Sequence, residues 1–321
     1  MKIFHHLRQP PWQMKLLHFA LLLLVASGCV VNQTKTHEAS VQVGGARIWL
    51  DIEPNVAASR ADVIEWVRRA AVAVTNCLGR FPVNGVVIRI HGGGYDAIAD
   101  GVAHGASSID VRLGPGVGEK DFDGDWILTH EMFHLGFPTL DPRYLWMMEG
   151  LSDYLEPIAR GRAGQLTQRQ VWREFVEGLP QGLPQAGDDG LDGSQSRERI
   201  YWGGNIYWLL ADVRIRAQTN NRRSVDDAIR AILAEGGNGG VVWPLNRVLK
   251  VGETATGTTV LKDLYEELGP QRGNVDLDAL WKQLGIHYDF GRITFNDHAP
   301  LARVREAITA PPVAVLRTPG S

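Results

Sequence analysis

The segment "LTHEMFHLGF" at positions 128–137 holds two histidines four residues apart, with a glutamate directly after the first. On an α-helix, residues i and i+4 lie on the same face, so His130 and His134 can bind one metal ion together. Glu131 lies about 100° around that helix, where its carboxylate can contact a water on the metal without binding the metal itself. Zn²⁺ lowers the pKa of such a water, and Glu131 would be the general base for its attack on a carbonyl. The alternative is an ordinary amphipathic helix with two core histidines.

A catalytic zinc site has three protein ligands and one open position, so the chain must supply a further side chain. The segment "YLWMMEGLSDYLEP" at 144–157 follows one turn-rich loop later, so its helix can pack antiparallel to the first. Glu149 stands in an apolar stretch, where an unpaired carboxylate would be costly to bury but a zinc ligand would not. Asp153 lies one turn later on the same face and can accept the free ring N–H of a ligating histidine. For Glu149 the alternative is a solvated helix face.

These helices must be positioned by the rest of the chain, which predicts a small β-rich lobe followed by a helical lobe. Strands are expected over 46–52, in "GVVIRIHGGG" and in "SSIDVRLGPG", with a helix over about 58–77. Helices are expected over 125–136, 142–160, 167–178, 200–219, 224–235, 258–268, 276–284 and 299–309. The segment 179–196 has turn composition and is expected to form a long surface loop bordering a substrate cleft.

Composition places the chain among ordinary globular proteins. The 321 residues are 44% hydrophobic and 21% charged, enough for one large domain or two with a substantial core. The formal net charge is −3, so the chain has no basic footprint for nucleic acid, and no nucleic-acid partner is expected.

The N-terminus resembles a targeting signal. Basic residues precede a short apolar run that ends in "VASGC", which is similar to a bacterial lipoprotein signal. This predicts a signal peptide over 1–28, lipidation of Cys29 and a polar tether over 29–42. The protein would then be anchored in the bacterial cell envelope on the periplasmic side, with plain secretion as the alternative. Cys77, the other cysteine, would have no disulfide partner.

The motif pair His130–Glu131–x–x–His134 and Glu149–Gly–x–x–Asp153 resembles the gluzincin metallopeptidases, the class of thermolysin and the glycyl and alanyl aminopeptidases. Three further stretches are similar to the glycyl aminopeptidase family: "YWGGNIYWLLADVRIRAQTNNRRSVDDAIRAI" (201–232), "FNDHAPLARVREAIT" (295–309) and "GVAHGASS" (101–108). The likeness runs over roughly 85–310. It implies an α+β, thermolysin-like catalytic domain over 43–310, divided into a β-rich lobe (43–121) and a helical lobe (122–310), with a C-terminal tail over 311–321.

The resemblance also implies roles for residues outside the zinc motif. Tyr201 takes the place of a tyrosine that hydrogen-bonds the oxyanion of the tetrahedral intermediate; an interfacial aromatic is the alternative. Independently of the resemblance, His104 lies at a strand end close to the zinc motif in sequence and could line the cleft, with the strand 107–113 as the edge that pairs with an extended substrate. The family carries a glutamate, a natural anchor for a substrate's α-amino group, where this chain has Ala103. Exopeptidase specificity would then need Asp96, Asp100 or Asp110 as a substitute.

These observations predict a zinc-dependent peptidase that hydrolyses peptide bonds with a metal-activated water, with an aminopeptidase as one form. His130, His134 and Glu149 are the expected zinc ligands. Glu131 and Tyr201 are the expected catalytic residues. The substrate would be a peptide or protein, and a lipid would hold the chain at a membrane. One rival is an endopeptidase or amidase of the same fold. The other is a catalytically silent zinc-binding envelope protein.

Overall fold

The computed structural model describes His37 and residues 39–311 of the chain. The expected signal peptide, the lipidation site Cys29 and nearly all of the expected tail lie outside these residues. Among the helices that are described, none combines the length and the apolar character that a bilayer crossing requires.

The first lobe is built on a five-stranded sheet with the strand order β1-β2-β3-β5-β4. Its elements are β1 (Ala39–Val43), β2 (Ala46–Ile52), α1 (Arg60–Leu78), β3 (Gly85–Gly92), β4 (Ile98–His104) and β5 (Ser108–Leu113). The outer pairs, β1 with β2 and β4 with β5, are antiparallel, whereas β3 runs parallel to both β2 and β5. Strand β4 is therefore a free edge of the sheet.

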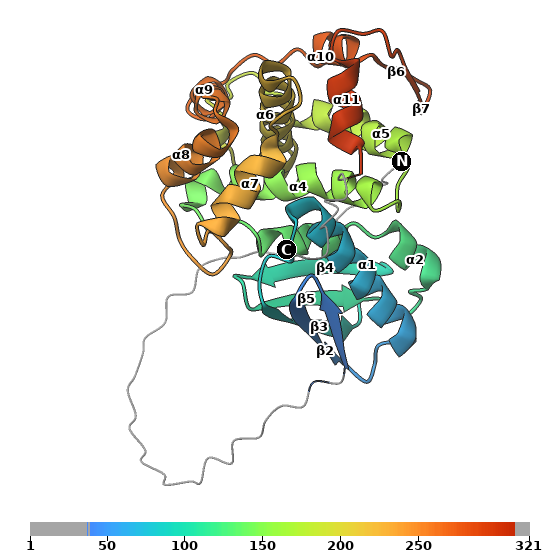
Figure 1. The fold of residues 1–321 in the computed structure, drawn as a ribbon. Coiled ribbons are helices and arrows are strands. Elements are labelled where there is room, and N and C mark those ends of the chain that lie inside the picture. Colours follow the sequence, from blue (N-terminus) through green and yellow to red (C-terminus); the bar gives the residue numbers. More distant parts are fainter. Residues whose placement is uncertain (1–36, 38, 312–321) are drawn as a thin grey trace, which may run out of the picture. The chain divides into compact units, whose positions relative to one another are not determined.

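One face of this sheet is buried and the other is largely polar. Apolar side chains alternate along the inner strands, and Ile48, Ile88 and Ile109 are fully buried. Helix α1 packs against β1, and α3 (Ile127–His134) packs against β4 and β5. The intervening positions, among them Arg89 and Asp110, remain partly exposed on the opposite face. Figure 1 shows α1 lying over the sheet. The second lobe, which is mainly helical, lies above the sheet in this view.

Two expectations for this lobe need correction. Strand β1 begins at Ala39, inside the segment 29–42 that was expected to be a tether, because Val41 is buried against Ile48 across the β1–β2 hairpin. The strand 107–113 was expected to be the edge, but β5 lies between β3 and β4. The true edge, "IADGVAH", has no β-branched run and no clear alternation, so it was not recognised as a strand.

The second lobe is mainly helical. It contains α2 (Glu119–Gly124), α3 (Ile127–His134), η1 (Pro142–Tyr144), α4 (Leu145–Arg162), α5 (Gln168–Gly178), η2 (Leu179–Gly182), η3 (Leu191–Gly193), the π-helix η4 (Arg199–Gly203), α6 (Gly204–Thr219), α7 (Val225–Ala234), α8 (Leu245–Thr256), α9 (Val260–Leu268), α10 (Leu277–Leu284), β6 (Ile286–Asp289), β7 (Arg292–Phe295) and α11 (Ala302–Thr309). The eight expected helices are all present, with shifted ends. Helices α2 and α8 and the β6–β7 hairpin were not expected; strands of four residues are too short to show a period.

The segment 179–196 differs from its expected role as a loop beside the cleft. It forms two short 3₁₀ turns, and Leu179 and Leu191 are buried. The Asp192 carboxylate accepts hydrogen bonds from the Trp146 indole and the Tyr265 hydroxyl, each at 2.9 Å. The segment is therefore a packed scaffold between helices, and it does not line the cleft described below.

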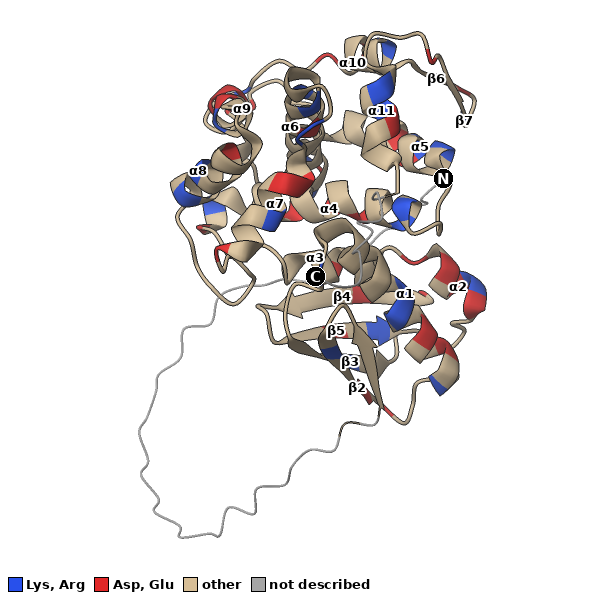
Figure 2. Cartoon of the chain, viewed as in Figure 1, with Lys and Arg blue, Asp and Glu red and all other residues tan. Residues whose placement is uncertain are grey.

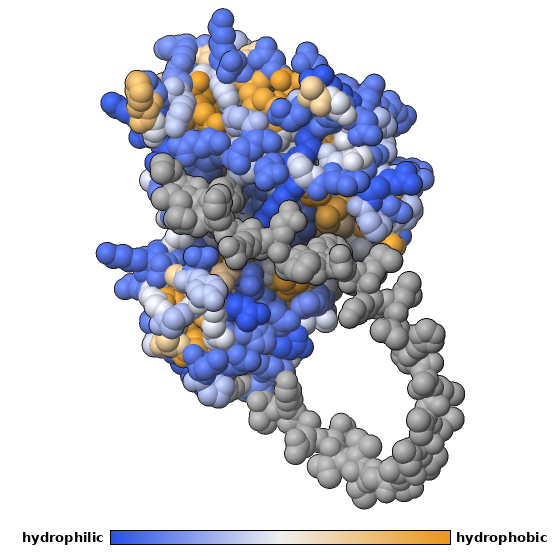
Figure 3. All heavy atoms as spheres, turned by 180° about the vertical axis from the view of Figure 1, so that it is seen from behind, coloured by the Kyte–Doolittle hydropathy of each residue, from blue (hydrophilic) through white to orange (hydrophobic). Residues whose placement is uncertain are grey.

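The fold confirms the predicted α+β class, with a small β-rich lobe followed by a helical lobe. Acidic and basic residues are interspersed over both lobes (Figure 2). Seen from behind, the described surface is mostly hydrophilic, with hydrophobic side chains in small separate groups (Figure 3). The apolar residues are otherwise gathered in one core cluster that extends through both lobes.

Candidate metal centre and cleft

Helix α3 is fixed at the junction of the lobes by its buried side chains and by its first turn. Leu128, Met132 and Phe133 are buried. The Asp125 carboxylate accepts the N–H groups of Ile127 (2.9 Å) and Leu128 (3.1 Å) and the indole N–H of Trp66 on α1 (2.9 Å). These bonds satisfy N–H groups at the start of the helix and tie it to α1.

Helix α4 brings a carboxylate to the two histidines of α3. The Nε2 atoms of His130 and His134 are 3.1 Å apart. Oε2 of Glu149 lies 3.2 Å from Nε2 of His130 and 3.4 Å from Nε2 of His134. Three electron-pair donors thus converge on one point, an arrangement that a bound cation or a proton on one imidazole stabilises. Within the described residues, these three side chains form a group with metal-ligand spacing.

The dimensions of this triangle suit zinc. Zn–N and Zn–O bonds of about 2.0–2.1 Å in a tetrahedron place neighbouring ligand atoms roughly 3.3 Å apart. The three distances between the donor atoms, 3.1, 3.2 and 3.4 Å, fall around that value. Two imidazoles and one carboxylate are also a donor set typical of catalytic zinc, which leaves the fourth position open.

A second layer of side chains orients the histidine rings. Oδ1 of Asp153 lies 3.0 Å from Nδ1 of His130, at an angle outside the usual hydrogen-bond range. The Ser152 hydroxyl lies 3.3 Å from Nδ1 of His134. These contacts direct the Nε2 atom of each ring towards Glu149. The structure therefore places Asp153 where the sequence predicted it, whereas Ser152 was not predicted.

The charges of the centre depend on one another in the metal-free protein. Burial opposes the charged form of His130, but Asp153 and Glu149 outweigh it and raise the pKa of His130 to about 10. Burial likewise opposes ionisation of Glu149, yet the two histidines hold the pKa of that carboxyl well below its usual range. A buried imidazolium thus stabilises the carboxylate when no metal is bound.

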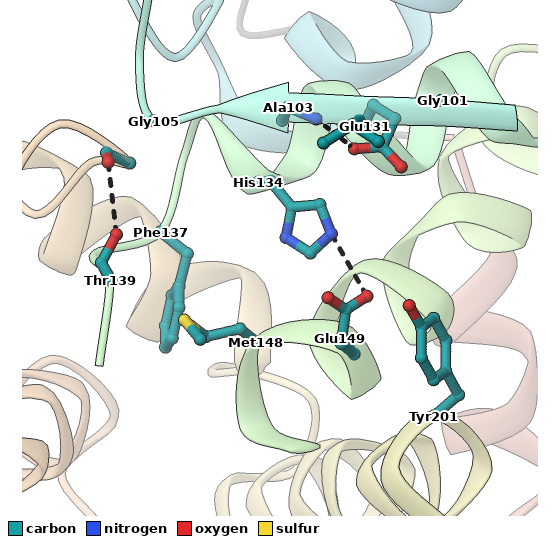
Figure 4. Close-up of a pocket in the computed structure, with 12 residues that line it drawn as sticks. Gly101, Ala103, Gly105, Glu131, His134, Phe137, Thr139, Met148, Glu149 and Tyr201 are labelled. Atoms are coloured by element: carbon teal, nitrogen blue, oxygen red, sulfur yellow. Dashed lines mark hydrogen bonds and ion pairs between the residues drawn. The ribbon is translucent and has the colours of Figure 1, made fainter. Parts of the chain in front are cut away.

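Glu131 points away from the three donors, towards the free edge of the sheet (Figure 4). Its Oε2 atom accepts the backbone N–H of Ala103 on β4 at 2.7 Å. That N–H faces outwards from the β4–β5 ladder, because its partner belongs to α3. A Cβ at Gly101, two residues earlier, would lie 3.0 Å from Cγ of Glu131, so β4 approaches the helix closely where it has no side chain.

Tyr201 lies in η4, a single turn of π-helix that precedes α6. Its ring stacks on His130, with centroids 6.1 Å apart and planes at 14°. A Cβ at Gly150 would collide with the backbone of Gly204, so the two glycines allow α4 and η4–α6 to cross in backbone contact. Burial, followed by the charge of Glu149, raises the pKa of Tyr201, so the phenol keeps its proton and remains a donor.

A cleft of about 270 Å³ opens beside this centre. Its lining residues are Gly101, Val102, Ala103, Gly105, Glu131, His134, Phe137, Thr139, Met148, Glu149, Tyr201 and Gly239. Figure 4 shows β4 along one side, with His134, Glu149 and Tyr201 opposite it. The cleft thus has one wall of functional side chains and one wall of backbone and small residues.

His104 does not line this cleft, contrary to expectation. It stands at the end of β4, where its Nε2 atom lies 2.8 Å from the Asp110 carboxylate on the polar face of the sheet. Side chains alternate along a strand, so His104 points to the opposite face from Ala103. The cleft wall that the sequence did not predict includes Gly239, in a segment that hydrogen-bonds Leu135 through its N–H. The glycine-rich sequence at 236–240 is typical of a turn, but it does not show that this turn lies beside the cleft.

Solved structures resemble this fold at low sequence identity. An aminopeptidase N family protein from Idiomarina loihiensis is 13% identical, with a TM-score of 0.61; the match covers 77% of this chain and 49% of that one. An M1 zinc metallopeptidase from Deinococcus radiodurans is 13% identical with a TM-score of 0.49, covering 75% and 52%. No protein-family model and no curated protein matches the sequence.

The chain thus spans about half of the length of the Idiomarina protein. At this identity the likeness concerns the fold, not the activity. The chain therefore shares its fold with about half of the Idiomarina protein, and in this fold the predicted donors His130, His134 and Glu149 meet at the junction of the two lobes.

Proposed function

We propose that this chain is a zinc-dependent peptidase whose active site is the cleft between β4 and the helices α3 and α4. The observation that carries the proposal is the triangle of donor atoms formed by His130, His134 and Glu149, with sides of 3.1–3.4 Å. One fold can host many unrelated functions. The likeness in fold is therefore consistent with the proposal but is not the observation on which it rests.

His130, His134 and Glu149 would hold the ion, and Asp153 would keep the ring of His130 in its binding orientation. When bound, zinc would supply Lewis acidity for the activation of water and the polarisation of a carbonyl. Glu131 lines the same cleft without belonging to the donor triangle, and the oxygen that does not accept the Ala103 N–H would take a proton from the nucleophile and pass it to the leaving amine. Tyr201, which stays protonated, would donate a hydrogen bond to the oxyanion.

The edge strand β4 offers a way to bind an extended peptide. Gly101 and Ala103 line the cleft along this edge. A peptide added to the edge would hydrogen-bond to the outward main-chain groups other than the Ala103 N–H, which Glu131 already accepts. Phe137, Met148 and Val102 supply most of the apolar side-chain surface of the cleft. We therefore propose a preference for an apolar substrate side chain next to the cleaved bond.

An endopeptidase or amidase is a second candidate, favoured by the charges of the cleft. A free α-ammonium needs an anionic partner when it is bound away from water. Within the described residues, the carboxylates that line the cleft are Glu131 and Glu149, and both have other proposed roles. Asp100 pairs with Arg112, Asp110 contacts His104, and neither they nor Asp96 line the cleft. A substrate with a blocked or internal amino group therefore fits this site better than a free N-terminus.

The proposal is tested by metal analysis and peptide hydrolysis on the same preparation of the full chain. We expect one zinc per chain, hydrolysis of peptides with an apolar residue at the cleaved bond, and faster hydrolysis of N-acetylated than of free peptides. Glu131→Gln should keep the zinc and lower kcat by roughly 10²–10⁴-fold. Glu119→Gln, on the exposed start of α2, is the matched control and should change neither quantity.

The outcomes separate the rivals. Bound zinc with no hydrolysis that depends on Glu131 would favour a catalytically silent zinc-binding protein. Faster cleavage of peptides with a free N-terminus than of N-acetylated peptides would favour an aminopeptidase. Another group would then have to bind the substrate's α-ammonium. A protein that binds no zinc at all would refute the proposal.

We further propose that the chain acts on peptides or proteins in the bacterial cell envelope, held there by a lipid on Cys29. The support is the N-terminal sequence, in which basic residues and an apolar run precede "VASGC". Mass spectrometry of the mature N-terminus tests this: a diacylglyceryl cysteine is expected, and cleavage at another position without lipid would favour plain secretion.

A further inference from the structure

The β6–β7 hairpin carries an aromatic residue where the backbone favours a different residue type. The strands pair in the register Asp289↔Arg292, which leaves Phe290 and Gly291 as a two-residue turn. Both have positive φ, 43° for Phe290 and 81° for Gly291, as a type I′ turn requires. Asn-Gly is the usual choice, and a bulky residue with positive φ is strained.

Nothing in the described residues compensates for this strain by burying the ring. The Phe290 side chain is fully exposed (100%) and Tyr288, two residues earlier, is 44% exposed. Most large apolar residues of the described chain are buried, so an aromatic at a hairpin tip costs stability and gains nothing within the fold. Figure 1 shows the hairpin at the outer end of the helical lobe, beside α10 and α5. Its position suits contact with something outside the molecule.

Directly beside the tip is a pocket of about 430 Å³ that is lined by three arginines. Arg169 and Arg173 stand one turn apart on α5, and Arg292 follows the tip on β7; Gly291 of the turn lines the same pocket. Figure 2 shows basic residues on α5 at this end of the lobe.

These arginines have little to neutralise them inside the protein. Among the described residues, none of the three forms an ion pair with a carboxylate, and the buried Nε of Arg173 has no hydrogen-bond partner. Of the nearby acids, Glu177 is engaged by the Tyr288 hydroxyl at 2.8 Å, and Asp289 lies opposite Arg292 in the hairpin without an ion-pair contact. The pocket thus offers unused guanidinium donors, whose fork geometry matches phosphate oxygens.

We propose that the β6–β7 hairpin and the arginine pocket form a docking surface for an anionic phospholipid bilayer. Phe290 would insert at the level of the headgroups, and the pocket of Arg169, Arg173 and Arg292 would hold a lipid phosphate. An exposed aromatic next to unpaired basic side chains is the combination that binds a membrane interface. A folded anionic partner protein would match the arginines but would not require a single projecting ring.

The test uses the full chain with vesicles of phosphatidylcholine, with or without phosphatidylglycerol. Hydrogen exchange followed by mass spectrometry measures protection at 286–295 and 168–178 directly, and co-sedimentation measures affinity. The segment before residue 37 contributes equally to all variants, so differences between variants report this surface. We expect protection of both segments with phosphatidylglycerol only, weakening as salt is raised.

Phe290→Asn is the decisive variant, because asparagine suits the left-handed turn and should leave the fold intact or stabilise it. We expect it to weaken binding to the anionic vesicles about tenfold. The double variant Arg169→Gln/Arg292→Gln should weaken binding roughly 20-fold and remove the preference for phosphatidylglycerol. Tyr95→Asn, at an equally exposed aromatic elsewhere, and Arg272→Gln, at an exposed arginine of another loop, are the matched controls and should bind as wild type.

Three results would overturn the proposal. The first is equal protection of the hairpin with neutral and anionic vesicles, or no protection with either. The second is unchanged vesicle binding by Phe290→Asn. The third is protection by inorganic phosphate alone with none from vesicles, which would identify a small-anion site. None of these readouts depends on zinc or hydrolysis, so they leave the proposed peptidase activity untouched.

Discussion

The two walls of the cleft are built on different principles. The α3–α4 wall presents side chains, among them His134 and Glu149, and their partner His130 is buried beside them. The β4 wall presents backbone, with Gly101 and Ala103 on the edge strand and Gly105 in the turn that follows it. The two walls would therefore have different roles. The chemistry would depend on particular side chains, whereas the substrate would be aligned by main-chain N–H and C=O groups.

The hydrogen bond between Ala103 and Glu131 is where the two walls meet. Strand β4 would bind the substrate backbone and also positions Glu131, the proposed general base. A change in β4 should therefore affect both substrate alignment and proton transfer. Variants on either wall should therefore separate metal binding, chemistry and alignment, and the following predictions are ordered by the size of the expected effect.

Removal of a ligand from the side-chain wall should have the largest effect. Glu149→Ala should lower zinc affinity on the order of 10³-fold and abolish hydrolysis at limiting zinc, because two imidazoles remain without their anionic partner. Zinc affinity is measured by competition with a chromophoric chelator. Ala103→Gly, on the backbone wall, should leave the affinity unchanged; an equal loss in both variants would contradict the distinction between the walls.

Tyr201→Phe should lower kcat by about 10²–10³-fold, because it removes the donor to the oxyanion. Zinc affinity should stay as in wild type, since the phenol is not among the donor atoms. Tyr95→Phe is the control, because it removes the hydroxyl of a fully exposed tyrosine. Tyr207→Phe would be a poor control, because the buried Tyr207 hydroxyl donates a hydrogen bond to the Leu261 carbonyl. Full activity in Tyr201→Phe would contradict the oxyanion role and favour the alternative, in which Tyr201 is an interfacial aromatic.

Ala103→Pro should lower kcat/KM by roughly 10- to 100-fold with zinc affinity unchanged. It removes the N–H that Glu131 accepts, and proline is tolerated on an edge strand where the N–H is not part of the ladder. Circular dichroism and the melting temperature check that the sheet remains folded. Activity equal to that of Ala103→Gly would show that the backbone contact is dispensable.

Zinc affinity should depend on pH, with about a tenfold increase per unit between pH 7 and 9. The pKa of His130 is raised to about 10 in the metal-free protein, so zinc must displace a proton from that ring over this range. Isothermal titration calorimetry in buffers of different ionisation enthalpy counts the released protons. An affinity that is flat over this range, with no proton release, would contradict the prediction.

The same groups predict how the stability of the metal-free protein depends on pH. The raised pKa of His130 stabilises the fold fully below its ordinary value of 6.5, and this contribution is lost as the pH rises towards 10. The lowered pKa of Glu149 stabilises the fold above its ordinary value of 4.5 and is lost in acid. The melting temperature of the chelated protein should therefore be highest between about pH 4.5 and 6.5, whereas the zinc-loaded protein should keep its stability up to pH 9.

Local sequence was sufficient where one helix determines the geometry. The spacing of His130 and His134 specifies a shared face, and Glu149 was recognised because a carboxylate in an apolar stretch needs a partner. It was insufficient where contacts join distant segments. His104 and the strand 107–113 were assigned to the cleft from their place near the motif, but strand order and side-chain alternation put them elsewhere.

The sequence by itself therefore determined the donor types, their helical spacing and the α+β class, because these follow from periodicities of a few residues. Only the tertiary structure decided which strand edge faces the helices, that Ala103 would hold Glu131, and that Gly150 and Gly204 would let Tyr201 stack on His130. Those features depend on close approach between segments far apart in the chain. Such an approach is set by the packing of the whole core, not by any single stretch of sequence.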